Sequence, residues 1–253
     1  NWRVISDPPL PGFRNMARDH ALTECLRGGE GVLRWYRWDP PTISFGRNEP
    51  SQGLFLEEKA EEEGVGFVRR PTGGRAVLHD RELTYSLAFP VDAFRGLKAG
   101  YRLINRGLLV GIRRLGAAVE LAAPHGPSLP PDAGPCFRPP AVGEVTALGQ
   151  KLVGSAQVRM GNAVLPHGSI TLDADQDGLR RLRRGTEDVP PPATLAGLLG
   201  RVPEPDVLAN TLQEGLASVL GGTWVADSYR DEETMAAEAL EAHYLDAEWT
   251  WRV

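Results

Sequence analysis

The segment RRPTGGRAVLHDRELTYSLAF occupies residues 69–89 and joins two stretches that are typical of β-strands. The first, VGFVRR, ends at Arg70, and the second, LTYSLAF, begins at Leu83. Between them, Gly73 and Gly74 allow backbone N–H groups to approach a ligand closely, and the flanking arginines make the turn electropositive. Such a turn could hold an anion or a carbonyl group. A simple hairpin turn that needs positive φ is the alternative.

Hydrophobic periodicity outside this segment predicts an α+β fold. Strands are expected at 32–38, 42–46, 65–70, 83–89, 119–123, 144–148, 151–159 and 163–172. Helices are expected at 15–26, 54–64, 101–115, 207–220 and 232–244. Because the strands come in groups with few helices between them, we predict mixed, mostly antiparallel sheets flanked by helices, not a doubly wound sheet.

Several local features refine this prediction. Asn15 is expected to cap the first helix, with Cys25 on its buried side. The strands at 32–38 and 42–46 are expected to pair, and the last three strands to form an antiparallel meander. The segment 123–140 is rich in proline, so we expect a long irregular loop there, of the kind that often carries function.

Composition excludes several classes of protein. The 253 residues carry 28 cationic and 33 acidic side chains, and this net charge of −5 argues against a nucleic-acid-binding protein. No stretch reaches the roughly 18 apolar residues of a membrane span, and no His, Cys or acidic residues show metal-ligand spacing. The two cysteines lie far apart in the sequence, so we expect no disulfide framework. We also expect the protein to be located in the reducing cytoplasm.

Four polar residues are candidates for chemistry. Lys151 is one of only three lysines and precedes an apolar strand with the small residues Gly154, Ser155 and Ala156. Partial desolvation there would suit proton transfer or hydrogen bonding to a carbonyl, whereas an exposed lysine at a strand edge is the alternative. Cys136 lies in the Pro-rich segment and could be a nucleophile or an inert packed thiol. His79 and His167 could be general bases or histidines that bond only to local backbone groups.

Taken together, three motifs resemble the lipoate-protein ligase and octanoyltransferase superfamily, which also includes the biotin ligases. The motifs are RRPTGGRAVLHDRELTYSLAFP, CFRPPAVGEVTALGQKLVGSAQVR and LPHGSITLD. The resemblance extends over residues 15–173 and implies a single catalytic domain over 1–253, with a C-terminal helical segment at 174–253. It is strongest to the ligase-related octanoyltransferases, because Cys136 stands 15 positions before Lys151 in a Cys-Phe context.

The resemblance assigns roles to individual residues. It implies that Cys136 accepts the acyl group and that Lys151 lies near the acyl carbonyl. Substrate binding is expected from Arg70, Gly73, Gly74, Arg75, Val77, His79, Gly154, Ser155, Ala156 and His167. Val77, Leu78, Val153 and Val158 are candidates for an apolar tunnel around the octanoyl chain.

The implied activity is transfer of an octanoyl group from octanoyl-acyl carrier protein to a lysine of a lipoyl domain. The acceptors would be the lipoyl domains of 2-oxoacid dehydrogenase complexes and the glycine cleavage H protein. No metal or cofactor is expected, and ATP and lipoate would be needed only if the chain were an ATP-dependent lipoate ligase. The same motifs are compatible with octanoyl transfer between lipoyl domains, and with non-catalytic binding of acyl groups or lipoyl domains.

Overall fold

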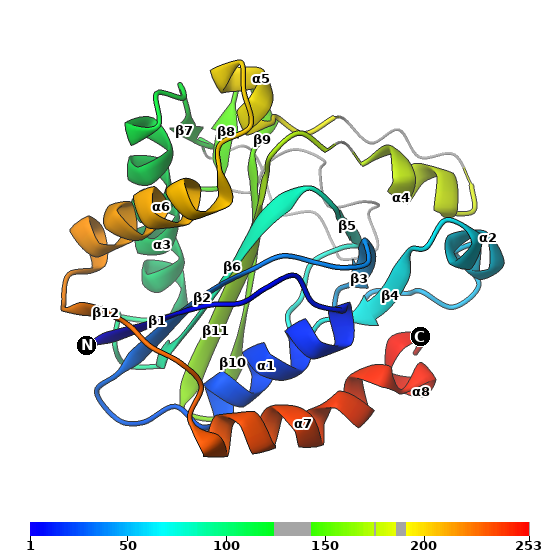
Figure 1. The fold of residues 1–253 in the computed structure, drawn as a ribbon, viewed down its shortest axis with the longest axis horizontal. Coiled ribbons are helices and arrows are strands. Elements are labelled where there is room, and N and C mark those ends of the chain that lie inside the picture. The colour runs from blue at the N-terminus through cyan, green and yellow to red at the C-terminus, as the bar shows by residue number, and fades with distance from the viewer. Residues whose placement is uncertain (124–142, 175, 186–190, 253) are drawn as a thin grey trace.

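The computed structural model describes residues 1–123, 143–174, 176–185 and 191–252, and its centre is a six-stranded sheet (Figure 1). This sheet contains β1 (Trp2–Ser6), β2 (Gly31–Tyr36), β6 (Glu82–Pro90), β10 (Val153–Met160), β11 (Ala163–Thr171) and β12 (Trp224–Ala226). The strand order is β10-β11-β6-β2-β1-β12, with β1 parallel to both of its neighbours and the other pairs antiparallel. The predicted α+β class with mixed, mostly antiparallel sheets is confirmed.

Helices cover both faces of this sheet (Figure 1). Helix α1 (Gly12–Glu24) covers one face and is itself covered by α7 (Asp231–Leu245), whereas α3 (Leu97–Arg114) and α6 (Pro205–Leu220) cover the other face. The remaining helices of the described residues are α2 (Glu57–Glu62), α4 (Asp177–Leu182), α5 (Leu195–Leu199) and α8 (Ala247–Thr250). Leu208, Leu212 and Leu216 recur every fourth residue of α6 and are fully buried in the main hydrophobic core. Each buried leucine contributes roughly 1.5–3 kcal/mol, so this periodic stripe holds α6 in the core that it shares with α3.

Two smaller sheets lie beside the central one. Strand β3 (Thr42–Phe45) pairs with β4 (Gly66–Arg69) and β5 (Val77–His79), and β8 (Val145–Ala147) pairs with β7 (Glu120–Leu121) and β9 (Gln150–Lys151). The expected pairing of the segments 32–38 and 42–46 is therefore wrong, because β2 and β3 belong to different sheets. The intervening residues 39–41 include two prolines, which lack N–H donors, and they lead the chain from one sheet to the other.

Three local predictions are also corrected. The first helix begins at Gly12, so Asn15 does not cap it but donates hydrogen bonds to the carbonyl oxygens of Leu10 and Arg37. Cys25 follows the end of α1 and is only partly buried. The predicted strand 151–159 is interrupted at Leu152, since β9 and β10 belong to different sheets, and the meander reduces to the β10–β11 hairpin.

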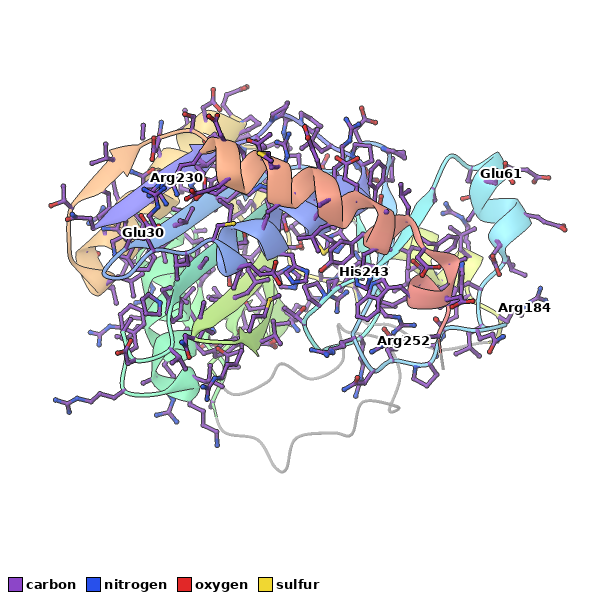
Figure 2. The ribbon with its side chains drawn as sticks, turned by 90° about the horizontal axis from the view of Figure 1, so that it is seen from below. Glu30, Glu61, Arg184, Arg230, His243 and Arg252 are labelled. Atoms are coloured by element: carbon purple, nitrogen blue, oxygen red, sulfur yellow. The ribbon has the colours of Figure 1, made fainter. Side chains whose placement is uncertain are left out.

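The C-terminal segment adds a strand and packs against the N-terminal half. Strand β12 forms the edge of the central sheet beside β1, and α7 lies across α1 (Figure 2). Arg230, which precedes α7, donates hydrogen bonds of 2.9 and 2.5 Å to the carboxylate of Glu30. Near the end of the chain, the buried guanidinium of Arg69 donates to the carbonyl oxygens of Trp249, Thr250 and Arg252.

None of the helices in the described part of the chain has the length and hydropathy needed to cross a bilayer.

Candidate active site

One face of the central sheet is polar at the end where β6 begins and β11 ends. Successive side chains of a strand point to opposite faces, and the register places Ser169 beside both Gly154 and Thr84. This face carries the small or polar residues Thr84, Ser86, Gly154, Ala156, His167 and Ser169. The other face carries apolar core residues, among them Leu83, Tyr85, Val153 and Ile170. A ligand can therefore be held on the polar face without opening the core.

Lys151 lies over this polar face and is buried. Its Nζ is 2.8 Å from Oε1 of Glu144, and the two side chains are only 5% and 4% exposed. A Cβ added to Gly154 would lie 3.5 Å from Cε and 3.9 Å from Nζ of Lys151, so the lysine chain packs directly on that glycine. The alternative of an exposed lysine at a strand edge is wrong.

A tight hairpin positions this lysine. Ala147 of β8 pairs with Gln150 of β9, which leaves Leu148 and Gly149 as a two-residue turn with φ values of 52° and 77°. Positive φ at both central residues is the geometry that suits the right-handed twist of paired strands. The hairpin thereby fixes Lys151 beside Glu144, which precedes β8.

The glycine-rich turn after β4 is held by Arg70. The Arg70 guanidinium donates to the carbonyl oxygens of Gly73 (3.2 Å) and Arg75 (2.9 Å), and also to the carbonyl and the hydroxyl oxygen of Ser44 on β3. Gly74 has φ of 96°, and a Cβ added there would lie 3.9 Å from Cβ of Ala156. The turn therefore lies over β10, two residues beyond the glycine on which Lys151 packs.

His79 belongs to a chain of hydrogen bonds that ends at this turn. Its Nε2 is 2.6 Å from Oγ of Ser44, and its Nδ1 is 2.7 Å from Oε1 of Glu82. The Glu82 carboxylate accepts a hydrogen bond from Nδ1–H of His79, and Oγ of Ser44 already accepts one from Arg70. The hydroxyl of Ser44 therefore donates its own hydrogen to Nε2 of His79. Trp38 stacks on the imidazole with ring centroids 3.9 Å apart. His79 thus joins the Glu82 carboxylate to the Arg70 turn.

His167 holds the other side of the same turn. Its Nε2 is 2.6 Å from Oγ1 of Thr72, and its Nδ1 is 4.0 Å from Oδ2 of Asp19 on α1. Burial, with smaller contributions from Arg70 and His79, holds the pKa of His167 well below its usual value. A neutral imidazole therefore links β11 to the glycine turn.

The buried carboxylate of Asp19 is a second anchor that the sequence did not reveal. It accepts hydrogen bonds from Arg34 (2.7 Å), Tyr36 (2.8 Å) and Ser86 (2.6 Å). Arg34 is itself fully buried, and its Nε also donates a hydrogen bond of 2.6 Å to Oδ2 of Asp7. This cluster fixes α1 against β2 and β6 at the margin of the polar face.

The structure brings together most of the candidate residues. Arg70, Gly74, His79, Lys151, Gly154, Ala156 and His167 lie around the polar face, with Val77 two residues before His79 on β5. Ser155 points to the opposite face, where its hydroxyl is 2.8 Å from Tyr85 Oη. Of the tunnel candidates, Leu78 and Val153 are in apolar clusters away from this face, because each alternates with a residue that faces it.

One candidate is not placed. Cys136 lies outside the described residues, as does most of the Pro-rich segment in which it was predicted to be reactive. Among the residues that the structure describes, no three His, Cys, Asp or Glu side chains come together to hold a metal ion.

The fold is of the lipoate-protein ligase type. The structure is similar to that of a putative lipoate protein ligase from T. acidophilum with bound lipoic acid. The TM-score is 0.83 with 22% identity, and the similarity covers 99% of both chains.

The sequence defines the family more closely. A model of the lipoyl protein ligase A/B catalytic domain matches residues 11–216, and the chain belongs to this family. Octanoyltransferase LipM of Kyrpidia tusciae is 37% identical over 99% of this chain and 98% of its own length. Octanoyltransferase LipM of Moorella thermoacetica is 35% identical, again over 99% and 98% of the two chains.

Proposed function

We propose that this protein is an octanoyltransferase that moves an octanoyl group from octanoyl-acyl carrier protein to a specific lysine of a lipoyl domain. The observation that carries the proposal is the similarity, over nearly the whole length of both proteins, to relatives that are octanoyltransferases. The buried Lys151–Glu144 pair beside the glycine turn supports it, because it provides a fixed cation where an acyl carbonyl would develop negative charge.

The reaction would proceed in two acyl transfers. The thiolate of Cys136 attacks the thioester carbonyl of the donor, and the carrier's phosphopantetheine sulfur leaves as a thiol after taking up a proton. The acceptor lysine, as a neutral amine, then attacks the octanoyl-cysteine. An amide forms, the Cys136 sulfur leaves, and the amine gives up one proton. A thioester is already activated, so neither step consumes ATP.

The described residues would serve this chemistry by position. Lys151 would hydrogen-bond the carbonyl oxygen and stabilise the charge of each tetrahedral intermediate. The turn at Gly73 and Gly74 would supply backbone N–H groups near the same carbonyl, held in place by Arg70, His79 and His167. Such preorganised donors cost no reorganisation when charge develops.

The partners follow from the two half-reactions. We propose octanoyl-acyl carrier protein as donor, with the lipoyl domains of 2-oxoacid dehydrogenase complexes and the glycine cleavage H protein as acceptors. Both cysteines are expected to remain reduced, as in the cytoplasm.

A choice of donors tests the proposal. The protein is incubated with apo-lipoyl domain and one of three donors: octanoyl-acyl carrier protein, free octanoate with ATP, or an octanoylated lipoyl domain. We expect octanoylation from the acyl carrier protein without ATP. Turnover only with free acid and ATP would indicate a ligase, and turnover only with the octanoylated domain would indicate an amidotransferase.

A further inference from the structure

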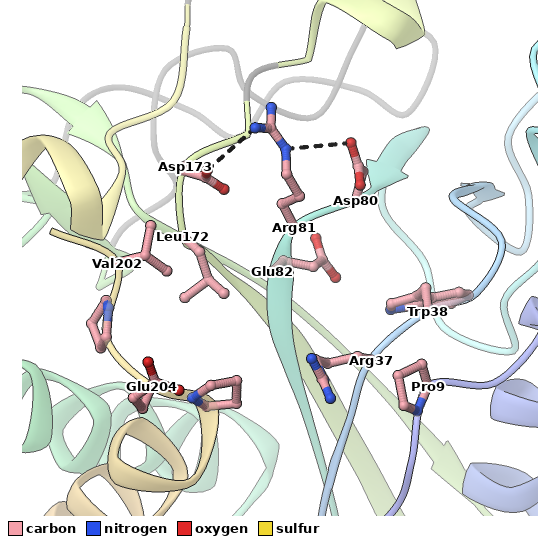
Figure 3. Close-up of a pocket in the computed structure, with 12 residues that line it drawn as sticks. Pro9, Arg37, Trp38, Asp80, Arg81, Glu82, Leu172, Asp173, Val202 and Glu204 are labelled. Atoms are coloured by element: carbon pink, nitrogen blue, oxygen red, sulfur yellow. Dashed lines mark hydrogen bonds and ion pairs between the residues drawn. The ribbon is translucent and has the colours of Figure 1, made fainter.

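A cavity of about 420 Å³ lies at the end of the central sheet where β6 begins (Figure 3). Trp38, Leu172 and Val202 provide apolar walls, and Arg37, Glu82 and Glu204 are among its polar lining residues. The cavity opens between the loop after β2 and the segment that precedes α6. It is separate from the glycine turn but borders the carboxylate that holds His79.

Glu82 offers one carboxylate oxygen to this cavity. Its Oε1 accepts hydrogen bonds from His79 Nδ1 (2.7 Å), Thr84 Oγ1 (2.6 Å) and Ser169 Oγ (2.6 Å). Within the described parts of the chain, no hydrogen bond reaches Oε2, although the residue is only 5% exposed. Figure 3 shows the carboxylate directed into the cavity. An oxygen that opens to the cavity is available to a ligand, and a cationic donor would form the strongest hydrogen bond with it.

The charges around the cavity favour a cation. Four carboxylates line it, from Asp80, Glu82, Asp173 and Glu204, against the two guanidinium groups of Arg37 and Arg81. Arg81 is already engaged, since it lies 3.2 Å from Asp173 and 3.7 Å from Asp80. The remaining balance around Glu82 is negative, which suits a primary ammonium group and disfavours a phosphate.

The cavity is also close to the proposed reaction centre. Thr171 pairs with Glu82, and its N–H donates to the carbonyl oxygen of Leu152, the residue after Lys151. Adjacent strands are about 4.8 Å apart, so Glu82 and Lys151 lie roughly 10 Å apart across the same end of the sheet. Both side chains are on the polar face. A lysine side chain that enters the cavity therefore approaches that face directly.

We propose that this cavity admits the acceptor lysine of the lipoyl domain and that Glu82 binds its ε-ammonium group, accepting the proton that must leave before the neutral amine attacks the octanoyl-cysteine. This inference rests on the proposed function and adds the route of the second substrate. The apolar walls would enclose the methylene chain of the lysine, and Glu82 would fix the nitrogen at its end. The chain through His79 and Ser44 to Arg70 would join the occupied cavity to the turn that holds the acyl group.

Separate measurement of the two half-reactions tests this proposal. Val202→Trp places an indole in the cavity wall, at a position that is 44% exposed. Val225→Trp makes the same change on β12, where Val225 is 56% exposed and does not line the cavity. Octanoyl-enzyme formation is followed by intact mass after addition of octanoyl-acyl carrier protein, and transfer is followed after addition of apo-lipoyl domain.

We expect Val202→Trp to form octanoyl-enzyme at the wild-type rate but to transfer the group at least about tenfold more slowly, with Val225→Trp normal in both steps. Unchanged transfer in Val202→Trp would overturn the proposal. Loss of octanoyl-enzyme formation in that variant would also overturn it, because the cavity would then serve the carrier's phosphopantetheine. Absence of octanoyl-enzyme in the wild type would contradict the proposed octanoyltransferase function itself, and this result differs from each of those that would contradict the lysine cavity alone.

A second variant keeps the test decisive if the indole disturbs folding. Glu82→Gln retains a carbonyl oxygen that can accept from His79 but removes the charge that faces the cavity. A hydrogen bond to a charged group contributes enough that we expect the KM for lipoyl domain to rise about tenfold to a hundredfold. Hydroxylamine, a small nucleophile that needs no lysine site, should still release the octanoyl group. An unchanged KM would contradict the assignment of Glu82.

Discussion

Glu144 Oε1 and Lys151 Nζ form an ion pair of 2.8 Å in which both side chains are almost completely buried. Removing one partner takes the opposite charge of this pair away from the other buried group, which typically costs 3–5 kcal/mol. We expect Lys151→Met to lower the free energy of unfolding by about 3 kcal/mol and to abolish octanoyl transfer. Urea denaturation with a parallel transfer assay measures both.

The double variant separates stability from catalysis. Lys151→Met with Glu144→Leu replaces the pair by apolar side chains and should recover most of the lost stability. It should recover no activity, since the cation beside the acyl carbonyl is absent. Restored transfer in the double variant would show that Lys151 has only a structural role.

His167 should make the protein less stable in mild acid. Its pKa is well below the usual value in the folded state, whereas in the unfolded chain it is near 6.5. Below that pH the unfolded chain takes up a proton at His167 that the folded protein excludes. The contribution of His167 to the free energy of unfolding is therefore complete above about pH 6.5. As the pH falls towards the folded-state pKa, the free energy of unfolding decreases by up to about 1.4 kcal/mol per pH unit.

The measurement is the free energy of unfolding between pH 7.5 and 5 for the wild type and for His167→Gln. A glutamine can still hydrogen-bond Thr72 but does not titrate. The variant should show a shallower loss of stability on acidification, and identical slopes would contradict the assignment to His167.

Two adjacent glycines should respond differently to alanine. Gly74 has φ of 96°, and a Cβ there would lie 3.1 Å from Nη2 of Arg70, whereas a Cβ on Gly73 meets no atom within 4 Å. We expect Gly74→Ala to cost about 1–2 kcal/mol of stability and Gly73→Ala less than about 0.5 kcal/mol. Thermal or urea unfolding decides this, and equal losses would argue against the strained turn.

The basic residues of the segment Arg180–Arg184, of which Arg180, Arg181 and Arg184 are exposed, are candidate contacts for the acidic carrier. Arg180 and Arg181 are paired with Asp177 and Glu63, whereas Arg184 is exposed at the surface (Figure 2). Exposed ion pairs contribute up to about 1 kcal/mol, so Arg184→Glu should raise the KM for octanoyl-acyl carrier protein by up to about fivefold, with kcat nearly unchanged. Added salt should reduce the difference, and a salt-independent KM would exclude the contact.

The hydrophobic periodicity of the sequence predicted the long helices and strands, because the apolar side chains that recur at that spacing are the ones that are buried. The helix 207–220 is α6 within two residues, and the strands around 83–89 and 163–172 are β6 and β11. Strand β1 was missed because five residues without alternation at the N-terminus give no strand signal that distinguishes them from loop. The predicted pairing of β2 with β3 was wrong because β2 pairs instead with β1 and β6, and no local pattern in the sequence identifies those partners.

The site could be predicted only where a motif contained it. Arg70, His79 and Lys151 stand out within the quoted motifs. Glu82 and Glu144 lie in the same motifs, but nothing in the sequence distinguishes them from other acidic residues, and Asp19 lies outside the motifs. Asp19 lies within a helical pattern, and its partner Arg34 comes from strand β2. No spacing in the sequence indicates that the two will meet, so a buried carboxylate of this kind is visible only in the structure.

Intact mass spectrometry decides whether Cys136 carries the octanoyl group, on which the proposed two-step transfer depends. Cys25→Ser is the matched control, because burial and the nearby carboxylates, with Glu233 first among them, raise the pKa of the Cys25 thiol. After incubation with octanoyl-acyl carrier protein, one octanoyl group should be found on the wild type and on Cys25→Ser, and none on Cys136→Ser. An undiminished adduct or full transfer activity in Cys136→Ser would contradict the proposed role of Cys136 as the acyl carrier.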